Sequence, residues 1–209
     1  MLTTLLLYFT SFFTLMNPLG SMPIFLGLTD GLNNKQRRST ATKAIITAFI
    51  TMVVFAFAGK YLFEFFNISI NGLKIVGSII FFIMGYDMLN SKIGRLKSND
   101  EEDDSSEDSG DIAFSPLGIP LLAGPGSITN AMVLMGESSS WTDKGVLVIS
   151  IFLVSLTSLF ILWGSSGIIK ILGNQGTKIM TKLMGLILMI IAVEFFFSGV
   201  TPFVKVMLH

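Results

Sequence analysis

The 209-residue chain contains no cysteine, and its single histidine, His209, is the last residue. The absence of cysteine excludes disulfide bonds, thiolate nucleophiles and cysteine-based metal sites. A histidine-dependent metal centre or a Ser-His dyad is not expected either, because the ligand or base would have to come from the end of the chain. We therefore predict no metal site, no cofactor and no catalytic residues.

Charged residues are also scarce. They make up 13% of the chain, against about 25% in a typical soluble domain, whereas 51% of the residues are hydrophobic and the mean hydropathy is +0.72. A soluble fold of this size cannot bury so much apolar surface, so the lipid bilayer is the predicted environment. The formal net charge of zero gives no indication of nucleic-acid binding.

Long uncharged runs occupy most of the chain. They are long enough for membrane-spanning helices, which need about 20 residues, and too continuously apolar for the alternating strands of a membrane β-barrel. The sequence therefore predicts an all-α membrane protein with six transmembrane helices. We expect these helices at residues 2–28, 41–64, 68–90, 112–136, 145–170 and 178–204.

Two short motifs occur twice in the chain. Pro18-Leu19-Gly20-Ser21 returns as Pro125-Gly126-Ser127 at an offset of 107 residues, and Lys74-x-x-Gly77 returns as Lys182-x-x-Gly185 at an offset of 108. The similar offsets predict duplicated halves at residues 1–90 and 112–209, joined by an acidic, solvated linker at 91–111. Because each half has an odd number of spans, its two copies enter the membrane from opposite sides. Two inverted three-helix repeats of this kind are typical of secondary transporters.

Lysine and arginine are distributed unevenly between the two sides of the predicted membrane. Loops one, three and five with their flanks hold ten of these residues, and the opposite side holds four. Since cytoplasmic loops carry the excess of positive charge, we expect the linker in the cytoplasm and both termini outside. The first span lacks the basic region of a cleaved signal peptide, so we expect it to be retained.

Proline and glycine interrupt two of the spans. Pro18 and Pro23 flank Gly20 in the first span, and the fourth span contains Pro116, Pro120, Gly124, Pro125 and Gly126. Proline removes a backbone donor and clashes with the preceding helical turn, so helices 1 and 4 are predicted to break. We expect Ser21 and Ser127 to cap the half-helices that follow the breaks.

Broken helices expose backbone groups that can bind a charged solute. The N-terminus of a half-helix favours a carboxylate, and the C-terminus of the preceding half-helix offers carbonyl groups to an ammonium group or a cation. A small zwitterionic solute therefore fits two such ends brought together near the bilayer midplane. The alternative is that these residues only allow close packing and kinking. The candidate substrate-binding residues are Asn17, Pro18, Gly20, Ser21, Gly124, Gly126, Ser127, Thr129 and Asn130.

Two acidic residues lie within predicted spans, Asp87 in the third and Glu194 in the sixth. Ionisable residues are costly in the bilayer, so both are candidates for a proton relay, although each can also be an interfacial carboxylate that reaches headgroup water. An intramembrane aspartyl protease needs two carboxylates that share a proton, and no Gly-x-Gly-Asp signature occurs, which disfavours an enzyme. A channel or a scaffold without carrier activity stays open as an alternative.

The residues around both breaks resemble a known family. The segments from Asn17 to Thr29 and from Pro116 to Ile128 closely resemble the MarC/SnatA family of bacterial and archaeal membrane proteins, and the resemblance extends over the whole chain. It implies a multi-pass protein of the bacterial inner membrane. Similarity to the SnatA branch further implies a secondary transporter of small neutral amino acids such as glycine or alanine, with a proton or a sodium ion as the candidate coupling ion.

Overall fold

The structure, a computed structural model, describes residues 1–29, 31–90 and 112–207. The predicted acidic linker at 91–111 lies outside the described residues. All regular secondary structure in the described part of the chain is helical, which confirms the predicted all-α fold. The elements are α1 (Leu2–Met16), α2 (Pro18–Leu28), α3 (Asn34–Phe65), α4 (Ile70–Leu89), η2 (Ala113–Leu122), α6 (Pro125–Glu137) and α7 (Trp141–Met207).

Five segments of the described chain are long and apolar enough to cross a membrane. The pair α1 and α2 forms one of them, and α7 contributes two, Trp141–Ser165 and Thr181–Lys205. Between these two parts α7 breaks at Gly173, whose φ of 64° lies in the left-handed region that glycine adopts readily. A sixth crossing results if η2 and α6, which are bent by 60°, form one span.

The second span begins earlier than the sequence predicts, at Asn34 and not at residue 41. The reason is a capping box at its start. The Asn33 side chain accepts hydrogen bonds from the N–H groups of Lys35 and Gln36, and the Gln36 side chain accepts one from the Asn33 N–H group. These bonds satisfy donors that a helix end otherwise leaves unpaired, so polar residues extend the helix beyond the apolar run.

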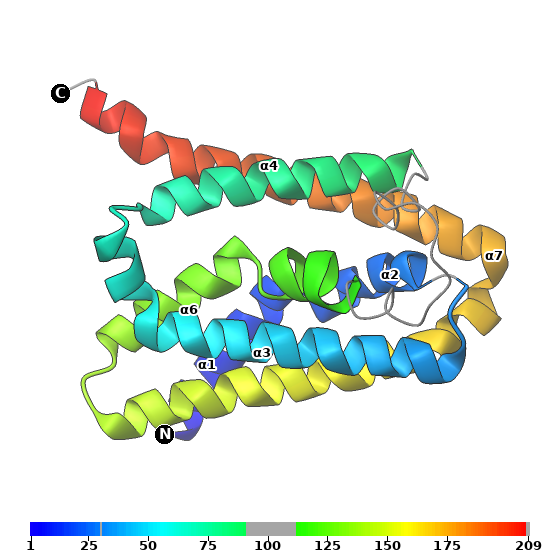
Figure 1. Ribbon diagram of the computed structural model, residues 1–209, viewed down its shortest axis with the longest axis horizontal. Helices are drawn as coiled ribbons and strands as arrows, with labels where there is room; N and C mark the ends of the chain where they lie inside the picture. Colours follow the sequence, from blue (N-terminus) through cyan, green and yellow to red (C-terminus); the bar gives the residue numbers. More distant parts are fainter. Residues whose placement is uncertain (30, 91–111, 208–209) are drawn as a thin grey trace.

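The helices lie in three layers (Figure 1). In this view α4 and the second part of α7 form the upper layer, and α3 and the first part of α7 form the lower one. The interrupted elements α1, α2, η2 and α6 lie between them, and both predicted helix breaks are present. The first and last described residues lie at the same end of the bundle, opposite the connection from α2 to α3.

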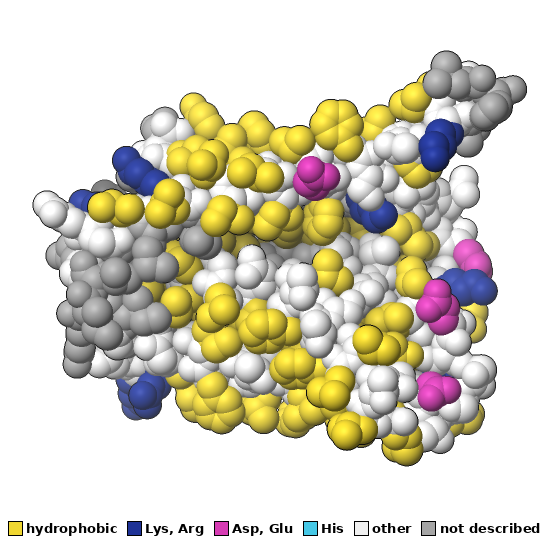
Figure 2. Space-filling view, turned by 180° about the vertical axis from the view of Figure 1, so that it is seen from behind, with side chains coloured by type: hydrophobic (Ala, Val, Ile, Leu, Met, Phe, Trp, Pro, Cys, Tyr) yellow, Lys and Arg dark blue, Asp and Glu magenta, His cyan; other side chains and the backbone are white. Residues whose placement is uncertain are grey.

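Burial follows this layering. Eight of the eleven residues of α2 are buried, whereas the outer helix α4 exposes the large apolar side chains of Ile79, Phe82 and Ile83. Apolar side chains also spread over the back of the molecule, and most charged side chains on that face lie towards its two ends (Figure 2). An apolar exterior around helices that satisfy their own backbone hydrogen bonds is suited to the hydrocarbon of a bilayer.

Glycines allow the closest approaches between helices. A Cβ atom added at Gly85 of α4 would lie 2.6 Å from the Gly185 carbonyl oxygen of α7, and one added at Gly185 would lie 2.7 Å from the Gly85 carbonyl oxygen. Gly77, the counterpart of Gly185 in the repeated motif, packs instead against the ring of Pro125 at the start of α6. Small residues permit such backbone contacts between membrane helices. The repeated glycines therefore share a packing role but have different partners.

Candidate functional site

Asn17 forms the break between α1 and α2. Its φ of 43° and ψ of 61° are left-handed, a conformation that asparagine tolerates better than most residues. Its N–H group donates to the Phe13 carbonyl oxygen at 3.0 Å, which ends α1, and its Oδ1 atom accepts from the Gly20 N–H group at 3.2 Å. Pro18 follows as the first residue of α2, a position that does not need its missing N–H group. One residue thus ends one half-helix and caps the next.

The prediction that Ser21 caps α2 is wrong, because Asn17 occupies that position. Ser21 is buried in the second turn, where its hydroxyl donates to the carbonyl oxygen of Asn17 at 3.0 Å and lies 3.3 Å from that of Met16. The cap comes earlier because Pro18 already begins the helix. The Ser21 hydroxyl therefore satisfies backbone carbonyl groups at the break.

The second break is built differently. Gly124, with φ −77° and ψ 170°, is the N-cap of α6, and no side chain forms a capping hydrogen bond there. The prediction that Ser127 caps this half-helix is therefore also wrong, since Ser127 is its third residue and lies inside the first turn. Ser127 is 1% exposed, and its hydroxyl has no hydrogen-bond partner among the described residues. No side chain therefore accepts a hydrogen bond from the first backbone N–H groups of α6.

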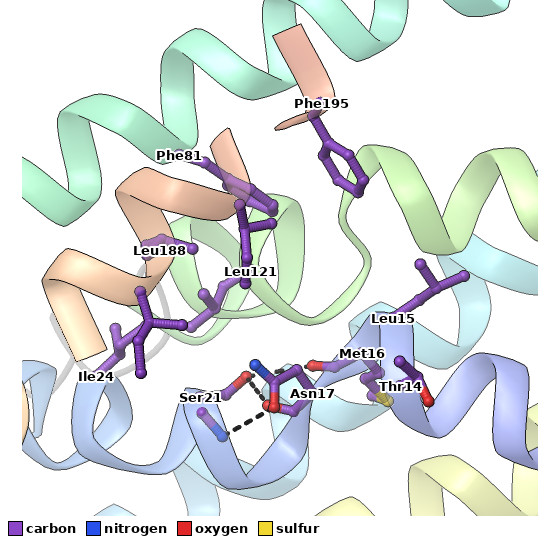
Figure 3. Close-up of a pocket in the computed structure, with 13 residues that line it drawn as sticks. Thr14, Leu15, Met16, Asn17, Ser21, Ile24, Phe81, Leu121, Leu188 and Phe195 are labelled. Atoms are coloured by element: carbon purple, nitrogen blue, oxygen red, sulfur yellow. Dashed lines mark hydrogen bonds between the residues drawn. The ribbon is translucent and has the colours of Figure 1, made fainter. Parts of the chain in front are cut away.

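A cavity of about 240 Å³ lies at the first break (Figure 3). Asn17, Gly20 and Ser21 are the predicted site residues that line it. The remaining lining residues come from the last turn of α1, from α2, from the end of η2, and from α4 and α7. They are Thr14, Leu15, Met16, Ile24, Phe81, Leu121, Ile187, Leu188, Ile191 and Phe195. A mainly apolar wall with a few convergent polar groups is typical of small-molecule sites.

Two of the lining residues lie four positions before a proline. Thr14 precedes Pro18, and Leu121 precedes Pro125. A continuous helix would offer the N–H group of the fourth following residue to each carbonyl oxygen, but proline has no such group. The two positions correspond under the repeat offset of 107. Each half of the chain therefore brings to the same cavity a residue whose carbonyl lacks its helical donor.

Phe195 connects the cavity with the second break. A Cβ atom added at Gly126 would lie 2.7 Å from Phe195 Cζ and 3.3 Å from Leu15 Cδ2, so both side chains cover the first turn of α6. Figure 3 shows the Phe195 ring extending from α7 towards the chain that enters α6. Phe81 of α4 stacks on Phe195 with ring centroids 6.3 Å apart. The first break lines the cavity directly, whereas aromatic and aliphatic side chains separate the second break from it.

The other predicted site residues have varied surroundings. The Asn130 side chain donates to the Ser11 hydroxyl at 3.0 Å, which joins α6 to α1, whereas the buried Thr129 hydroxyl has no partner within the described ranges. Pro18 is buried at the start of α2. Of the proposed relay acids, Asp87 is partly buried and Glu194 is exposed, and neither lines the cavity.

Sequence reasoning missed the apolar part of the cavity wall. Phe81, Leu188 and Phe195 lie in uniformly apolar spans, where a cavity-facing side chain has the same character as one that faces lipid. The one usable signal was the proline spacing that marks Thr14 and Leu121. The aromatic residues could be assigned only from the packing of α4 and α7 against the breaks.

Comparison with known proteins gives a consistent family assignment. The model of the MarC family, described as integral membrane proteins, matches residues 2–204. A UPF0056 membrane protein of Pyrococcus horikoshii is 38% identical, with 94% of each chain covered. The UPF0056 membrane protein YvbG of Bacillus subtilis is 36% identical over 91% of each chain. No solved structure matches the chain.

Proposed function

The chain belongs to the MarC family of integral membrane proteins, and we propose that it is a secondary transporter of small neutral amino acids. One zwitterionic solute binds at the half-helix ends near the bilayer midplane. The observation that carries the proposal is the cavity at the first break, because it is lined by residues from both halves of the chain. Its volume of about 240 Å³ lies below the range of about 300–1,000 Å³ for drug-sized ligands, which favours a small solute.

The polar groups around the cavity suit a zwitterion. The carbonyl groups of Thr14 and Leu121, which lack helical donors, can accept hydrogen bonds from an ammonium group. The first turns of α2 and α6 offer partial positive charge to a carboxylate. The apolar side chains of the wall would contact a short aliphatic side chain, and their bulk disfavours a large one.

The packing of the spans supports an inverted repeat. In the first half, α3 packs against the broken span of the second half, with an added Cβ atom at Gly118 of η2 lying 3.0 Å from Thr47. In the second half, the first part of α7 packs against the broken span of the first half, where the Ser158 hydroxyl contacts Met16 Sδ at 3.3 Å. This crosswise packing is expected of two halves related by an axis in the membrane plane.

We further propose that the protein resides in a bacterial inner membrane with both termini outside. The position of both ends on one side of the bundle supports this orientation, as does the excess of basic residues in the predicted cytoplasmic loops. A reporter that works only in the cytoplasm should be active when inserted in the 91–111 segment and inactive at the C-terminus. A cytoplasmic C-terminus would contradict the orientation.

The decisive experiment is uptake by purified protein in liposomes. We expect saturable accumulation of radiolabelled alanine and glycine that depends on an imposed proton or sodium gradient. Non-saturable flux would indicate a channel, and no flux of either amino acid would overturn the proposal in favour of a scaffold or an enzyme. If a proton gradient drives uptake, loss of that dependence in Asp87→Asn or Glu194→Gln would assign the proton relay.

A further inference from the structure

The start of α6 has the features of an anion site. Pro125 has no N–H group and no side chain caps this end, so the N–H groups of Gly126 and Ser127 are the donors of the first turn. The positive end of the helix dipole adds to them. The buried hydroxyl of Ser127 is a second, independent indication of a ligand at this helix end.

The Ser127 hydroxyl has no hydrogen-bond partner among the described residues, and the residue is only 1% exposed. Buried hydroxyl groups are nearly always hydrogen-bonded because an unsatisfied one is costly. Cα–Cβ bonds in a helix tilt towards its N-terminus, so the Ser127 side chain leans towards the unpaired N–H groups. A bound carboxylate would satisfy the hydroxyl and the backbone donors together.

Phe195 separates this turn from the cavity. Its ring lies on the first turn of α6 through the contact at Gly126, and it also forms part of the cavity wall. We infer that the first turn of α6 is the carboxylate subsite of the transporter and that Phe195 covers it in this structure. The inference rests on the proposed function and assigns the carboxylate to only one of the two half-helix ends. Binding then requires the Phe195 ring to move aside.

The absence of native cysteine allows a direct test of access, because a single introduced thiol can be followed. Ser127→Cys places a thiol at the subsite. We expect it to react slowly with a methanethiosulfonate reagent, and about tenfold faster or more once Phe195→Ala is added, because thiolate reactivity follows access and local positive potential. A sulfonate-bearing reagent should react faster than a trimethylammonium-bearing one. Phe195→Leu provides a milder opening if Phe195→Ala does not fold.

Ser155→Cys is the matched control. Ser155 is 3% exposed and its hydroxyl also lacks a partner within the described part of the chain, but it lies inside the first part of α7 and not at a helix end. Its reaction rate should not change with Phe195→Ala. Equal acceleration at Ser155→Cys would show general loosening, and an unchanged rate at Ser127→Cys, or faster reaction with the cationic reagent, would also overturn the subsite.

Protection by solute separates this inference from the proposed function. Alanine, at a concentration that saturates uptake by Ser127→Ala, should slow labelling of Ser127→Cys in the Phe195→Ala background, and alaninamide, which lacks the carboxylate, should not. If wild-type protein transports alanine but alanine gives no protection, the carboxylate subsite is wrong and the transporter proposal stands. The opposite outcome is that wild-type protein transports neither alanine nor glycine, while Phe195→Ala still speeds labelling of Ser127→Cys and the sulfonate-bearing reagent still reacts faster. In that case the transporter proposal fails and the anion site stands.

Discussion

The two helix breaks correspond in sequence but differ in chemistry. At the first break, the Asn17 side chain accepts from Gly20 and the Ser21 hydroxyl donates to nearby carbonyl groups, so local side chains satisfy part of the exposed backbone. At the second break, no side chain caps α6 and the Ser127 hydroxyl is unpartnered within the described residues. The first break adjoins the cavity, whereas Phe195 covers the second. Two breaks at corresponding places in the sequence can therefore differ in their local hydrogen bonding.

The largest expected effect on uptake concerns the bracing of the second break. A Cβ atom at Gly77 would overlap the rigid ring of Pro125, so Gly77→Ala must displace the start of α6. Overpacking of this kind costs about 1–3 kcal/mol, and we expect lower thermal stability together with loss of alanine uptake. Gly164→Ala is the control, because nothing lies within 4 Å of its added Cβ atom. Equal stability and uptake in the two variants would show that the contact at Pro125 does not brace the break.

A second prediction compares the two serines. Ser127→Ala should raise the half-saturation concentration for alanine uptake about tenfold or more, because a hydrogen bond to a charged group contributes about 1.5–3 kcal/mol. Without solute, the same change should leave stability unchanged or slightly higher, since it removes a buried unsatisfied hydroxyl. Ser21→Ala should behave in the opposite way, losing about 0.5–1.5 kcal/mol of stability with a smaller effect on uptake.

The measurements are uptake kinetics in liposomes and thermal unfolding of the same purified variants in detergent. Ser127→Ala should have the larger effect on uptake, and Ser21→Ala should have the larger effect on thermal stability. If both serine variants shifted uptake and stability by similar amounts, the two breaks would be chemically equivalent, and the difference drawn from their hydrogen bonds would be incorrect.

A third prediction tests the cap of the first break. Asn17→Ala removes the bond to Gly20, which costs about 0.5–2 kcal/mol, and it places alanine in the left-handed conformation, which costs a further amount of about 1–2 kcal/mol. Asn17→Gly should lose only a few tenths of a kcal/mol, because glycine takes this conformation freely and is a tolerated cap. Thermal unfolding of both variants measures the difference, and a glycine variant as unstable as the alanine one would contradict this account of Asn17.

A small effect on stability is expected at the far end of α2. Arg37 Nε donates to the Thr29 hydroxyl at 3.1 Å, and the Arg37 Nη2 atom donates to the Thr29 carbonyl oxygen at 3.1 Å. Lysine keeps the charge but cannot form both hydrogen bonds in this geometry. Arg37→Lys should therefore lower the free energy of unfolding by about 0.5–1.5 kcal/mol, the contribution of one ordinary hydrogen bond. Arg38→Lys is the control, since Arg38 lies over the Trp163 ring instead. A greater loss of stability in Arg38→Lys than in Arg37→Lys would contradict a stabilising role for the two hydrogen bonds from Arg37 to Thr29.

Local sequence rules predicted the breaks but not their caps. The prolines marked where the helices break, because a proline fixes φ and lacks a donor wherever it occurs, but the predicted restarts after Ser21 and Ser127 lie a few residues beyond the observed starts at Pro18 and Pro125. The choice between Asn17 and Ser21 depended on which residue directly precedes the first helical turn, a distinction of a few positions that exceeds the precision of boundary prediction. The start of α3 also differed from its predicted position, because the capping box at Asn33 extends the helix beyond its apolar run.

By itself, the sequence determined the membrane environment, the helical architecture and the two interruptions, because composition, run length and proline act locally. Only the tertiary structure decided what the interruptions face. In a lipid-surrounded helix, apolar side chains lie on every side, so hydropathy does not distinguish Phe195 above the start of α6 from Phe197 on the exposed surface. Likewise, Gly77 and Gly185 share one motif, but the packing of α4 against α6 and α7 gave them different partners. These contacts join residues distant in the chain and depend on how the layers assemble.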